Sequence, residues 1–343
     1  MKPHPILYPL SLVYGFVVWI RNVLFDSGIL KSVDVGVPVI SIGNITTGGT
    51  GKTPMTIEVA KYFLDRGKRI AVVSRGYGRV SQGTIVVSDG LNVLANVAQG
   101  GDEMLLIARQ LPNAIVIADG KRVRGAKKAV EEYRADMIVL DDGFQHRYLH
   151  RHVDIVLVEG SRPLMKTMLL PAGYRREPLN CVRRADAVVV TKVHDPLDAS
   201  LIVSDPNVAA VTNKFSCSYV PVAVMNIFDG VRQSLEILKG HSVVAVSGIA
   251  NPVSFENDIE SSGAKISSQF AFADHHRYTN ENVWQISETY RVKRADFIVT
   301  TEKDAVKLSE FKNEFSEIPV LALKMAVQIH QQEQWENFLF MAV

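Results

Sequence analysis

The sequence predicts an α/β protein with a doubly wound, mostly parallel sheet, a second, smaller α/β domain, and an apolar helix at the N-terminus. Short continuous apolar runs alternate with stretches of helical spacing, which is typical of a parallel sheet covered on both faces. The chain has 343 residues, too many for one ordinary core and about right for two domains. Residues 5–20 carry no charge and stand before this alternating pattern begins.

The N-terminal apolar run is shorter than the ~20 residues that cross a bilayer, and no small-residue cleavage site follows it. We therefore expect neither a spanning helix nor a signal peptide. A helix lying in the membrane interface would place aromatic side chains at headgroup level and basic ones near anionic lipid. The residues concerned are Tyr8, Tyr14, Trp19, Lys2, Arg21 and Lys31. A buried helix packed on the domain is the other interpretation.

Strands of the main domain are predicted from six apolar runs separated by helical stretches. They are residues 37–42, 69–74, 114–117, 137–140, 155–158 and 187–191. A Gly-rich segment follows the first run, and a helix is expected after it over residues 56–66. These elements predict a core domain over residues 31–213, preceded by the helical segment of residues 1–30.

The pattern changes near residue 213, where polar and β-prone residues surround Pro221. We expect a connecting strand or hinge over residues 214–226, followed by a smaller α/β domain over residues 227–343. Its predicted strands are residues 242–247, 296–301 and 319–323, with a helix near 252–261 and an amphipathic stretch reaching Phe340.

Composition narrows the class of protein. The chain is 47% hydrophobic and 22% charged, which is the balance of a folded chain and not of a disordered one. The formal net charge is only +2, whereas a general nucleic-acid binder usually has a stronger basic excess, so we expect no nucleic acid. The two cysteines, Cys181 and Cys217, lack metal-site spacing and fit a reduced cytosolic chain. No obligate protein partner is evident.

The Gly-rich segment has the composition of a phosphate-binding loop. Such a loop needs flexible residues whose N–H groups turn towards phosphate oxygens, a Lys to neutralise charge, and a Ser or Thr to hold Mg²⁺. Pro54 suits the first turn of the next helix, whose N-terminus then faces the phosphates. A Gly-rich turn without a ligand is the plain alternative. The residues expected to bind the nucleotide, ATP, are Thr46, Thr47, Gly48, Gly49, Thr50, Gly51, Lys52 and Thr53.

An apolar strand over residues 137–140 ends in two carboxylates, Asp141 and Asp142. A carboxylate at that position can hold the Mg²⁺ that bridges the phosphates. We expect Thr53 and Asp141 to hold the metal, with Asp142 assisting, although a solvated strand end or helix cap would look the same. His146 follows closely and is expected near the same rim.

Phosphoryl transfer to an alcohol benefits from a carboxylate that accepts the hydroxyl proton. Asp102 and Glu103 follow a Gly turn and precede a helix, so they are candidates, but acids that cap a helix are common there. His275 lies in an Asp-His-His loop of the second domain and could orient a carboxylate across the cleft. A surface His pair is the alternative interpretation.

Ten short segments combine into a pattern that is highly specific as a set. They are residues 42–54, 74–79, 101–103, 141–146, 170–173, 176–179, 184–187, 248–252, 272–275 and 301–304. Together with the N-terminal apolar segment, they resemble the lipid A 4′-kinases (tetraacyldisaccharide 4′-kinases). Thr46, where the common phosphate-loop motif has Gly, fits this family's version of the loop. Met104 departs from the family's pattern, in which Pro is expected after Gly-Asp-Glu.

The resemblance implies a kinase that moves the γ-phosphate of ATP, with Mg²⁺, to the 4′-hydroxyl of a tetraacylated glucosamine disaccharide 1-phosphate. It implies that Asp102 is the base, His275 its partner, and Lys52 a catalytic cation. Asp142, Glu103, His146 and Glu177 match supporting or substrate positions. An acceptor with four acyl chains stays in the bilayer, so the resemblance favours a peripheral helix and the cytoplasmic face of the bacterial inner membrane.

Two other classes of function remain to be weighed. A P-loop ATPase or GTPase switch for membrane-associated assembly would share the phosphate loop, but such switches can carry an extra Lys near the start of the loop, where Thr46 and Thr47 stand here. Lys192 is followed by Asp195 three residues later, one residue too far for a guanine-reading motif. A membrane-bound binding module without chemistry is the third interpretation, and Asp102 with His275 argues against it only through the family resemblance.

Overall fold

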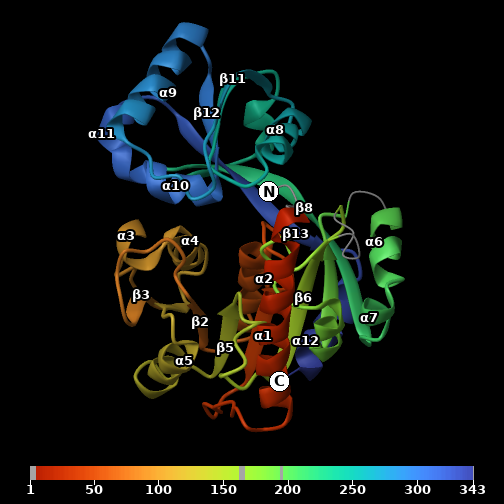
Figure 1. The fold of residues 1–343 in the computed structure, drawn as a ribbon. Helices are drawn as coiled ribbons and strands as arrows, with labels where there is room; N and C mark the ends of the chain where they lie inside the picture. The colour runs from red at the N-terminus through yellow and green to blue at the C-terminus, as the bar shows by residue number, and fades with distance from the viewer. Residues whose placement is uncertain (1–4, 162–166, 194–195, 343) are drawn as a thin grey trace.

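The computed structural model describes residues 5–161, 167–193 and 196–342. Lys2 and Asp195, which entered the predictions above, lie outside the described residues. The described chain forms a larger lobe and a smaller lobe, stacked one above the other in Figure 1, and a single sheet runs through both. The order of its strands is β11-β10-β12-β13-β8-β7-β6-β1-β5-β2-β4-β3, with the short β9 paired to β8.

The larger lobe is built on the parallel part of this sheet, in which only the edge pair β3–β4 is antiparallel. Its strands are β1 (Val39–Asn44), β2 (Ile70–Ser74), β3 (Ile85–Asp89), β4 (Ile115–Ala118), β5 (Met137–Asp141), β6 (Val153–Glu159) and β7 (Ala187–Thr191). Every residue of β1, β2 and β4 to β7 is buried, because helices cover both faces. The predicted α/β class with a mostly parallel sheet is confirmed.

Two long strands join the lobes. The first residues of β8 (Asn213–Asn226) pair in parallel with β7, and the rest pair antiparallel with β13 (Val320–Ile329). Beyond them the smaller lobe contains β9 (Arg232–Gln233), β10 (Ser242–Ser247), β11 (Lys265–Ala271) and β12 (Phe297–Thr301). The proposed hinge, residues 214–226, falls within β8, so the connection between the lobes is a hydrogen-bonded strand.

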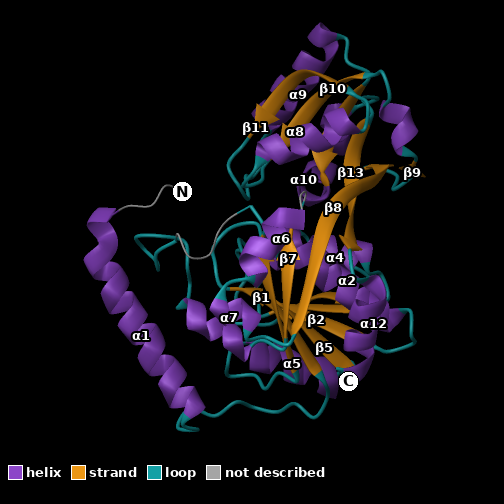
Figure 2. Cartoon of the chain, turned by 90° about the vertical axis from the view of Figure 1, so that its right-hand side faces the viewer, coloured by secondary structure: helices purple, strands orange, loops and turns teal. Residues whose placement is uncertain are grey.

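The helices flank the sheet as Figures 1 and 2 show. In the larger lobe they are α2 (Lys52–Leu64), α3 (Val97–Gly100), α4 (Asp102–Gln110), α5 (Arg122–Glu131), α6 (Pro196–Val203) and α7 (Pro206–Ala209). In the smaller lobe they are α8 (Pro252–Ser261), α9 (Asn280–Lys293), α10 (Glu302–Leu308) and α11 (Lys312–Phe315). The last helix, α12 (Gln332–Met341), returns to the larger lobe, where Trp335 is buried against Phe215 with ring centroids 5.1 Å apart.

Three strands have no counterpart among the predicted ones: the two-residue β9, and β3 and β11, which lie at the two edges of the sheet. β3 is only partly buried, and β11 is exposed or half-buried along its length. Neither of these two edge strands therefore needs the continuous apolar run by which buried strands are recognised. The sequence Lys265–Ala271 contains two serines and a glutamine, so it lacks the apolar run from which a strand would be predicted.

In the N-terminal helix α1 (Tyr8–Asp26), polar side chains face the protein and apolar side chains face outward. An ordinary surface helix shows the opposite arrangement. The buried residues of α1 include Ser11 and Asn22, whereas Phe16, Val17 and Trp19 are more than half exposed. By length and composition this helix could cross a membrane, with 22% of its most apolar window buried. Figure 2 shows it as a long rod along the flank of the larger lobe. The interpretation of α1 as a buried core helix is therefore wrong.

Polar bonds fasten the inner face of α1 to the segment that follows β6. Ser11 Oγ donates to the carbonyl oxygen of Leu169 at 2.9 Å, and Tyr14 Oη donates to that of Arg176 at 2.8 Å. Tyr14 thus faces the protein, so its expected place at the lipid headgroups is wrong. Tyr8 and Trp19 do lie on the exposed side, at 48% and 56% exposure.

Candidate active site

The phosphate loop lies between the carboxyl end of β1 and the first turn of α2. Gly51 adopts the left-handed backbone (φ 84°) that caps α2, a conformation that glycine tolerates without strain. Neighbouring side chains hold the loop in place. Asn44 Nδ2 donates to Thr50 Oγ1 at 2.8 Å, and Thr191 Oγ1 donates to the carbonyl oxygen of Thr50 at 2.9 Å. Tyr219 Oη donates to the carbonyl oxygen of Gly51 at 3.1 Å.

Asp141 lies at the end of β5, next to β1 in the sheet, and is fully buried. Its carboxylate accepts hydrogen bonds from Thr56 Oγ1 at 3.1 Å and Ser74 Oγ at 3.4 Å. Burial, followed by the negative charges of Glu103 and Asp142, raises the pKa of Asp141 to about 7. The negative charges around this carboxylate would favour the binding of a cation beside it.

Asp142, the next residue, faces basic side chains instead. Arg176 Nη1 donates to both of its carboxylate oxygens, at 2.8 and 2.9 Å, and Lys52 Nζ lies 3.7 Å away. Burial opposes ionisation of Asp142, but Lys52 and Arg176 outweigh it and lower its pKa. Asp142 therefore links Lys52 of the phosphate loop to Arg176, which lies in the segment that is hydrogen-bonded to α1.

The two lobes meet at Asp102 and His275. Asp102 begins α4 of the larger lobe, while His275 lies between β11 and α9 of the smaller lobe, with a left-handed backbone (φ 60°) that is strained for a non-Gly residue. His275 Nδ1 lies 3.0 Å from Asp102 Oδ2 and 3.2 Å from Oδ1. Two residues separated by 173 positions thus form the pair that the sequence suggested.

Within the pair, the pKa of Asp102 is lowered and the pKa of His275 is raised. Burial disfavours the carboxylate of Asp102, but the hydrogen bond from His275 and the charge of Lys303 outweigh burial and lower its pKa. Burial also disfavours a charged His275, yet its bond to Asp102 raises its pKa overall. Asp102 therefore stays ionised, as a base requires.

Helix α10 places two lysines beside this pair, and the sequence predicted no role for either of them. Lys303 Nζ lies 3.1 Å from His275 Nε2 and 3.7 Å from Glu103 Oε1, and Lys307 Nζ lies 3.8 Å from Asp102 Oδ2. Both lysines lie in or near the segment 301–304 that matched the family. Their spacing of four residues places them on one face of α10, which is the signal that could have identified them.

Glu103 links this pair to Asp141, the metal candidate at the end of β5. Its carboxylate pairs with Lys303, and its charge contributes to the raised pKa of Asp141. The base candidate and the metal candidate therefore belong to one electrostatic cluster.

His146 is half-buried, whereas Glu177 is fully buried. Burial, with the nearby charges of Arg122 and Arg151, lowers the pKa of His146 to about 4, so its imidazole is neutral near physiological pH. Glu177 is fully buried and accepts hydrogen bonds from Asn22 Nδ2 at 3.0 Å and Arg184 Nη1 at 3.0 Å. The structure thus places Glu177 directly beneath α1.

The profile of one protein family, described as tetraacyldisaccharide-1-P 4′-kinase (LpxK), matches residues 3–343 of the chain. The chain belongs to the tetraacyldisaccharide 4′-kinase family. The predicted kinase of lipid A biosynthesis is thereby confirmed, and the P-loop switch is not favoured. Because Met104 is fully buried within α4, its departure from the family pattern is accommodated inside the larger core.

Relatives in this family are similar over nearly the whole chain. The tetraacyldisaccharide 4′-kinase of Halothermothrix orenii is 38% identical over 318 residues, covering 89% of this chain and 83% of the relative. That of Syntrophus aciditrophicus is 38% identical over 339 residues, covering 96% and 90%. A crystal structure of Aquifex aeolicus LpxK, described as an "apo" form in complex with ATP, is 32% identical and superposes with a TM-score of 0.78, covering 98% of each chain. These matches agree with the ATP-dependent activity predicted for the chain.

The described residues contain no cluster of three or more His, Cys, Asp or Glu side chains placed to hold a metal ion. Mg²⁺ in such kinases is held by one or two protein oxygens together with phosphate oxygens, so a dedicated protein cage is not needed. The buried carboxylate of Asp141, with its raised pKa, and the Thr53 hydroxyl in the first turn of α2 fit that arrangement.

Proposed function

We propose that the chain transfers the γ-phosphate of ATP to the 4′-hydroxyl of a tetraacyldisaccharide 1-phosphate, with Asp102 as the base. The observation that carries this proposal is the pairing of Asp102 with His275 across the two lobes, in one charge cluster with the phosphate loop. The acceptor hydroxyl gives its proton to the Asp102 carboxylate as its oxygen bonds to the γ-phosphorus. The bond between that phosphorus and the bridging oxygen breaks, and ADP leaves with the electron pair.

The phosphate-loop residues and their neighbours bind the phosphates and the metal ion. The N–H groups of Thr47 and Thr50 already donate to carbonyl oxygens of Tyr174 and Gly48, so other backbone N–H groups of the loop, such as those of Gly51 and Lys52, bind the phosphate oxygens. Lys52 neutralises the charge that develops on them. Thr53 and Asp141 would hold Mg²⁺, which screens the phosphate charge when bound. Asp142 positions Lys52 through their 3.7 Å contact.

The two lobes offer a way to exclude water from this transfer. We place the hinge in residues 214–226, between a core domain of residues 31–213 and a smaller domain of residues 227–343. Asp102 and His275 meet only when these domains come together, so closure over the acceptor's sugar headgroup assembles the pair and protects ATP from hydrolysis.

Transfer of label from ATP to lipid tests the reaction. The full chain is incubated with [γ-³²P]ATP, Mg²⁺ and a tetraacyldisaccharide 1-phosphate in detergent, and the lipid is separated by thin-layer chromatography. We expect a labelled lipid with the wild type and none with Lys52→Ala. Release of labelled phosphate without any labelled lipid would instead support the ATPase switch.

We also propose that α1 docks on the cytoplasmic face of the bacterial inner membrane, where the acceptor's acyl chains lie. The outward side of α1 is apolar, while its inward side is fixed to the protein by the bonds of Ser11, Tyr14 and Asn22. A helix held in this way lies along the membrane surface with its apolar side towards the lipid. The protein would be peripheral.

Vesicle flotation tests this surface. The double variant Phe16→Asp with Val17→Asp places two charges on the outward side of α1, where both side chains are 59% exposed. We expect it to float poorly with anionic phospholipid vesicles while binding ATP normally. Val292→Asp, at a 70% exposed position on α9, is the matched control and should float like the wild type. Equal flotation of all three proteins would remove α1 as the membrane contact.

A further inference from the structure

Lys303 contacts three groups of the charge cluster around the Asp102–His275 pair. Its ammonium lies 3.1 Å from His275 Nε2, 3.0 Å from Asp274 Oδ1 and 3.7 Å from Glu103 Oε1. Only 16% of its side chain is exposed, and although burial opposes its charge, Asp102 and Glu103 outweigh burial and raise its pKa. Lys303 is therefore a cation under physiological conditions.

Its contact with His275 has a chemical consequence. A lysine ammonium only donates hydrogen bonds, so Nε2 of His275 must accept one through its lone pair. The proton of a neutral imidazole then sits on Nδ1, which faces Asp102. A second proton on Nε2 would place two donors opposite each other at 3.1 Å.

We infer that Lys303 is a positioning residue that opposes protonation of His275 at Nε2 and directs the Nδ1 proton at Asp102. The inference rests on the proposed role of Asp102 as base. An Asp–His pair whose Nε2 is free readily takes up a proton, because the carboxylate stabilises the imidazolium. Lys303 opposes that uptake, so the pair keeps its net negative charge and Asp102 keeps its basicity at lower pH.

The charges that face His275 come from two elements besides its own loop. α4 supplies Asp102 and Glu103, and α10 supplies Lys303 and Lys307, of which Lys307 lies beside Asp102. Asp274 precedes His275 in the loop, with Oδ2 3.9 Å from Nε2. From the segment after β2, Tyr77 adds only an uncharged ring, with its centroid 4.7 Å away. Lys303 alone among the described cations touches the ring nitrogen.

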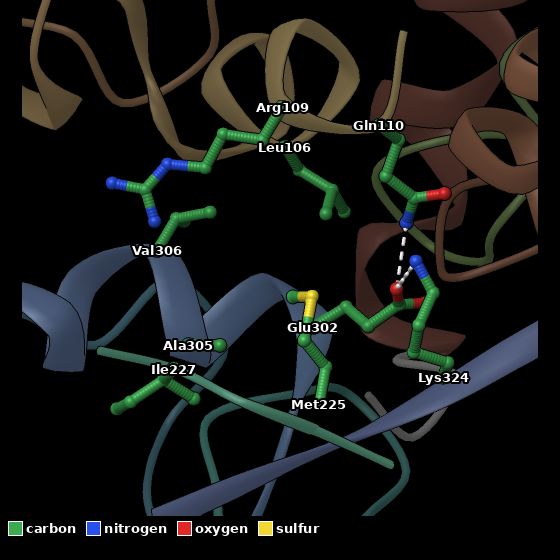
Figure 3. A pocket seen from close by; sticks show the side chains of 9 residues that line it. All are labelled: Leu106, Arg109, Gln110, Met225, Ile227, Glu302, Ala305, Val306 and Lys324. Carbon is green, nitrogen blue, oxygen red and sulfur yellow. Dashed lines mark hydrogen bonds and ion pairs between the residues drawn. The ribbon is translucent and has the colours of Figure 1, made fainter. Parts of the chain in front are cut away.

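The position of Lys303 is fixed by its neighbour in the sequence. Glu302 accepts a hydrogen bond from Gln110 Nε2 of α4 at 2.8 Å and pairs with Lys324 of β13 at 3.3 Å. Figure 3 shows these three side chains meeting at one side of a pocket between α4 and α10. The contact sets how α10 sits against α4, and it therefore directs Lys303 towards the Asp102–His275 pair.

Nitrogen NMR of ¹⁵N-histidine-labelled full chain tests the inference. The resonances of His275 are assigned by their loss in His275→Gln and are followed from pH 5 to 9. In the wild type we expect that, once pH exceeds the pKa of His275, the neutral form carries its proton on Nδ1. In Lys303→Met the pKa of His275 should rise by roughly one pH unit or more, because a like charge within about 4–6 Å has been removed. Lys293→Met, at an exposed position on α9, should leave it unchanged.

The kinetic counterpart separates positioning from a merely structural role. In Lys303→Met the acid limb of kcat should move to higher pH by the same amount as the pKa of His275, with little change in KM for ATP. Lys303→Arg, which keeps the charge, should restore part of that shift. Should Lys303→Met fold poorly, Lys303→Gln supplies the same comparison, because it also lacks the charge.

An unchanged or lower pKa of His275 in the charge-removing variant would overturn the inference. A kcat lowered equally at every pH would do so too. The NMR result does not depend on turnover, so a wild type that shows the expected tautomer but labels no lipid would count against the proposed function alone.

Discussion

The hydroxyl of Tyr219 donates a hydrogen bond to the carbonyl oxygen of Gly51, and so joins strand β8 to the phosphate loop. Thr191 of β7 binds the preceding carbonyl, that of Thr50, in the same way. In a planar trans peptide the carbonyl and the following N–H point in opposite directions. The N–H groups of Gly51 and Lys52 are therefore turned away from these strands, as a loop that cradles phosphate requires.

Removing the hydroxyl should weaken ATP binding selectively. We expect Tyr219→Phe to raise KM for ATP about 5-fold, which corresponds to the ~1 kcal/mol contributed by a typical hydrogen bond. KM for the lipid acceptor should stay the same. Initial rates at varied ATP and saturating acceptor measure the effect. Tyr62→Phe is the control, because Tyr62 donates a similar 3.1 Å bond to the carbonyl of Glu336 away from the loop. Equal changes in both variants would show that the loop contact is not special.

Asp102→Asn keeps the size of the side chain but removes its basicity. We expect kcat to fall by about 10²–10⁴-fold, the usual contribution of a general base. The dissociation constant for ATP, measured by isothermal titration calorimetry, should be nearly unchanged, because among the described residues Asp102 bonds or pairs with Glu103, His275 and Lys307 and with no residue of the phosphate loop. Loss of ATP binding with normal turnover at saturating ATP would show that Asp102 is not the base.

Lys52→Ala should abolish transfer while leaving the fold intact. The lysine ammonium supplies charge to the phosphates that no other side chain of the loop can replace. The partner it leaves behind, Asp142, still receives two hydrogen bonds from Arg176, so no buried carboxylate is left unpaired. Circular dichroism and thermal melting compared with wild type check the fold, and the labelled-lipid assay checks transfer. Normal turnover would remove the phosphate-loop assignment.

The parts of the fold that could be predicted are those in which the type of each residue reflects whether its position is buried or exposed. Strands such as Met137–Asp141 are buried on both faces, so their apolar runs stand out in the sequence. The phosphate loop could be recognised because its glycines, Lys52 and Thr53 are contiguous. The edge strand β11 could not, since half of its surroundings is solvent and its side chains are accordingly mixed.

In the active site, too, the individual residues could be predicted from local segments, but their contacts could not. Asp102 and His275 were named because each lies in a recognisable segment, but their 3.0 Å contact depends on how two lobes meet. The roles of Lys303 and Tyr219 depend on the packing of α10 and on the register of β8, neither of which a local pattern encodes. Tyr14 was misplaced for a related reason, because an aromatic in an apolar run does not reveal which side of the helix faces the protein.

Glu177 provides a test of how α1 is held. Its fully buried carboxylate receives bonds from Asn22 of α1 and from Arg184, and Arg21 of α1 lies 3.7 Å away. Glu177→Gln leaves Arg184 without its carboxylate, so we expect a loss of about 3 kcal/mol, the lower end for a broken buried pair because Arg184 is partly exposed. Glu132→Gln, which removes an exposed pair with Lys128, should cost well under 1 kcal/mol.

The dependence of this loss on pH follows from the pKa of Glu177. Burial raises it, but Arg184 and Asn22 outweigh burial and lower it below its ordinary value of 4.5. The unfolded chain therefore binds the proton more readily, and Glu177 stabilises the fold fully above about 4.5 and progressively less as pH falls through its folded pKa. The difference in unfolding temperature between wild type and Glu177→Gln should be large near neutral pH and should shrink on acidification. A difference that persists in acid would mean that the shape of the side chain, not its charge, holds α1.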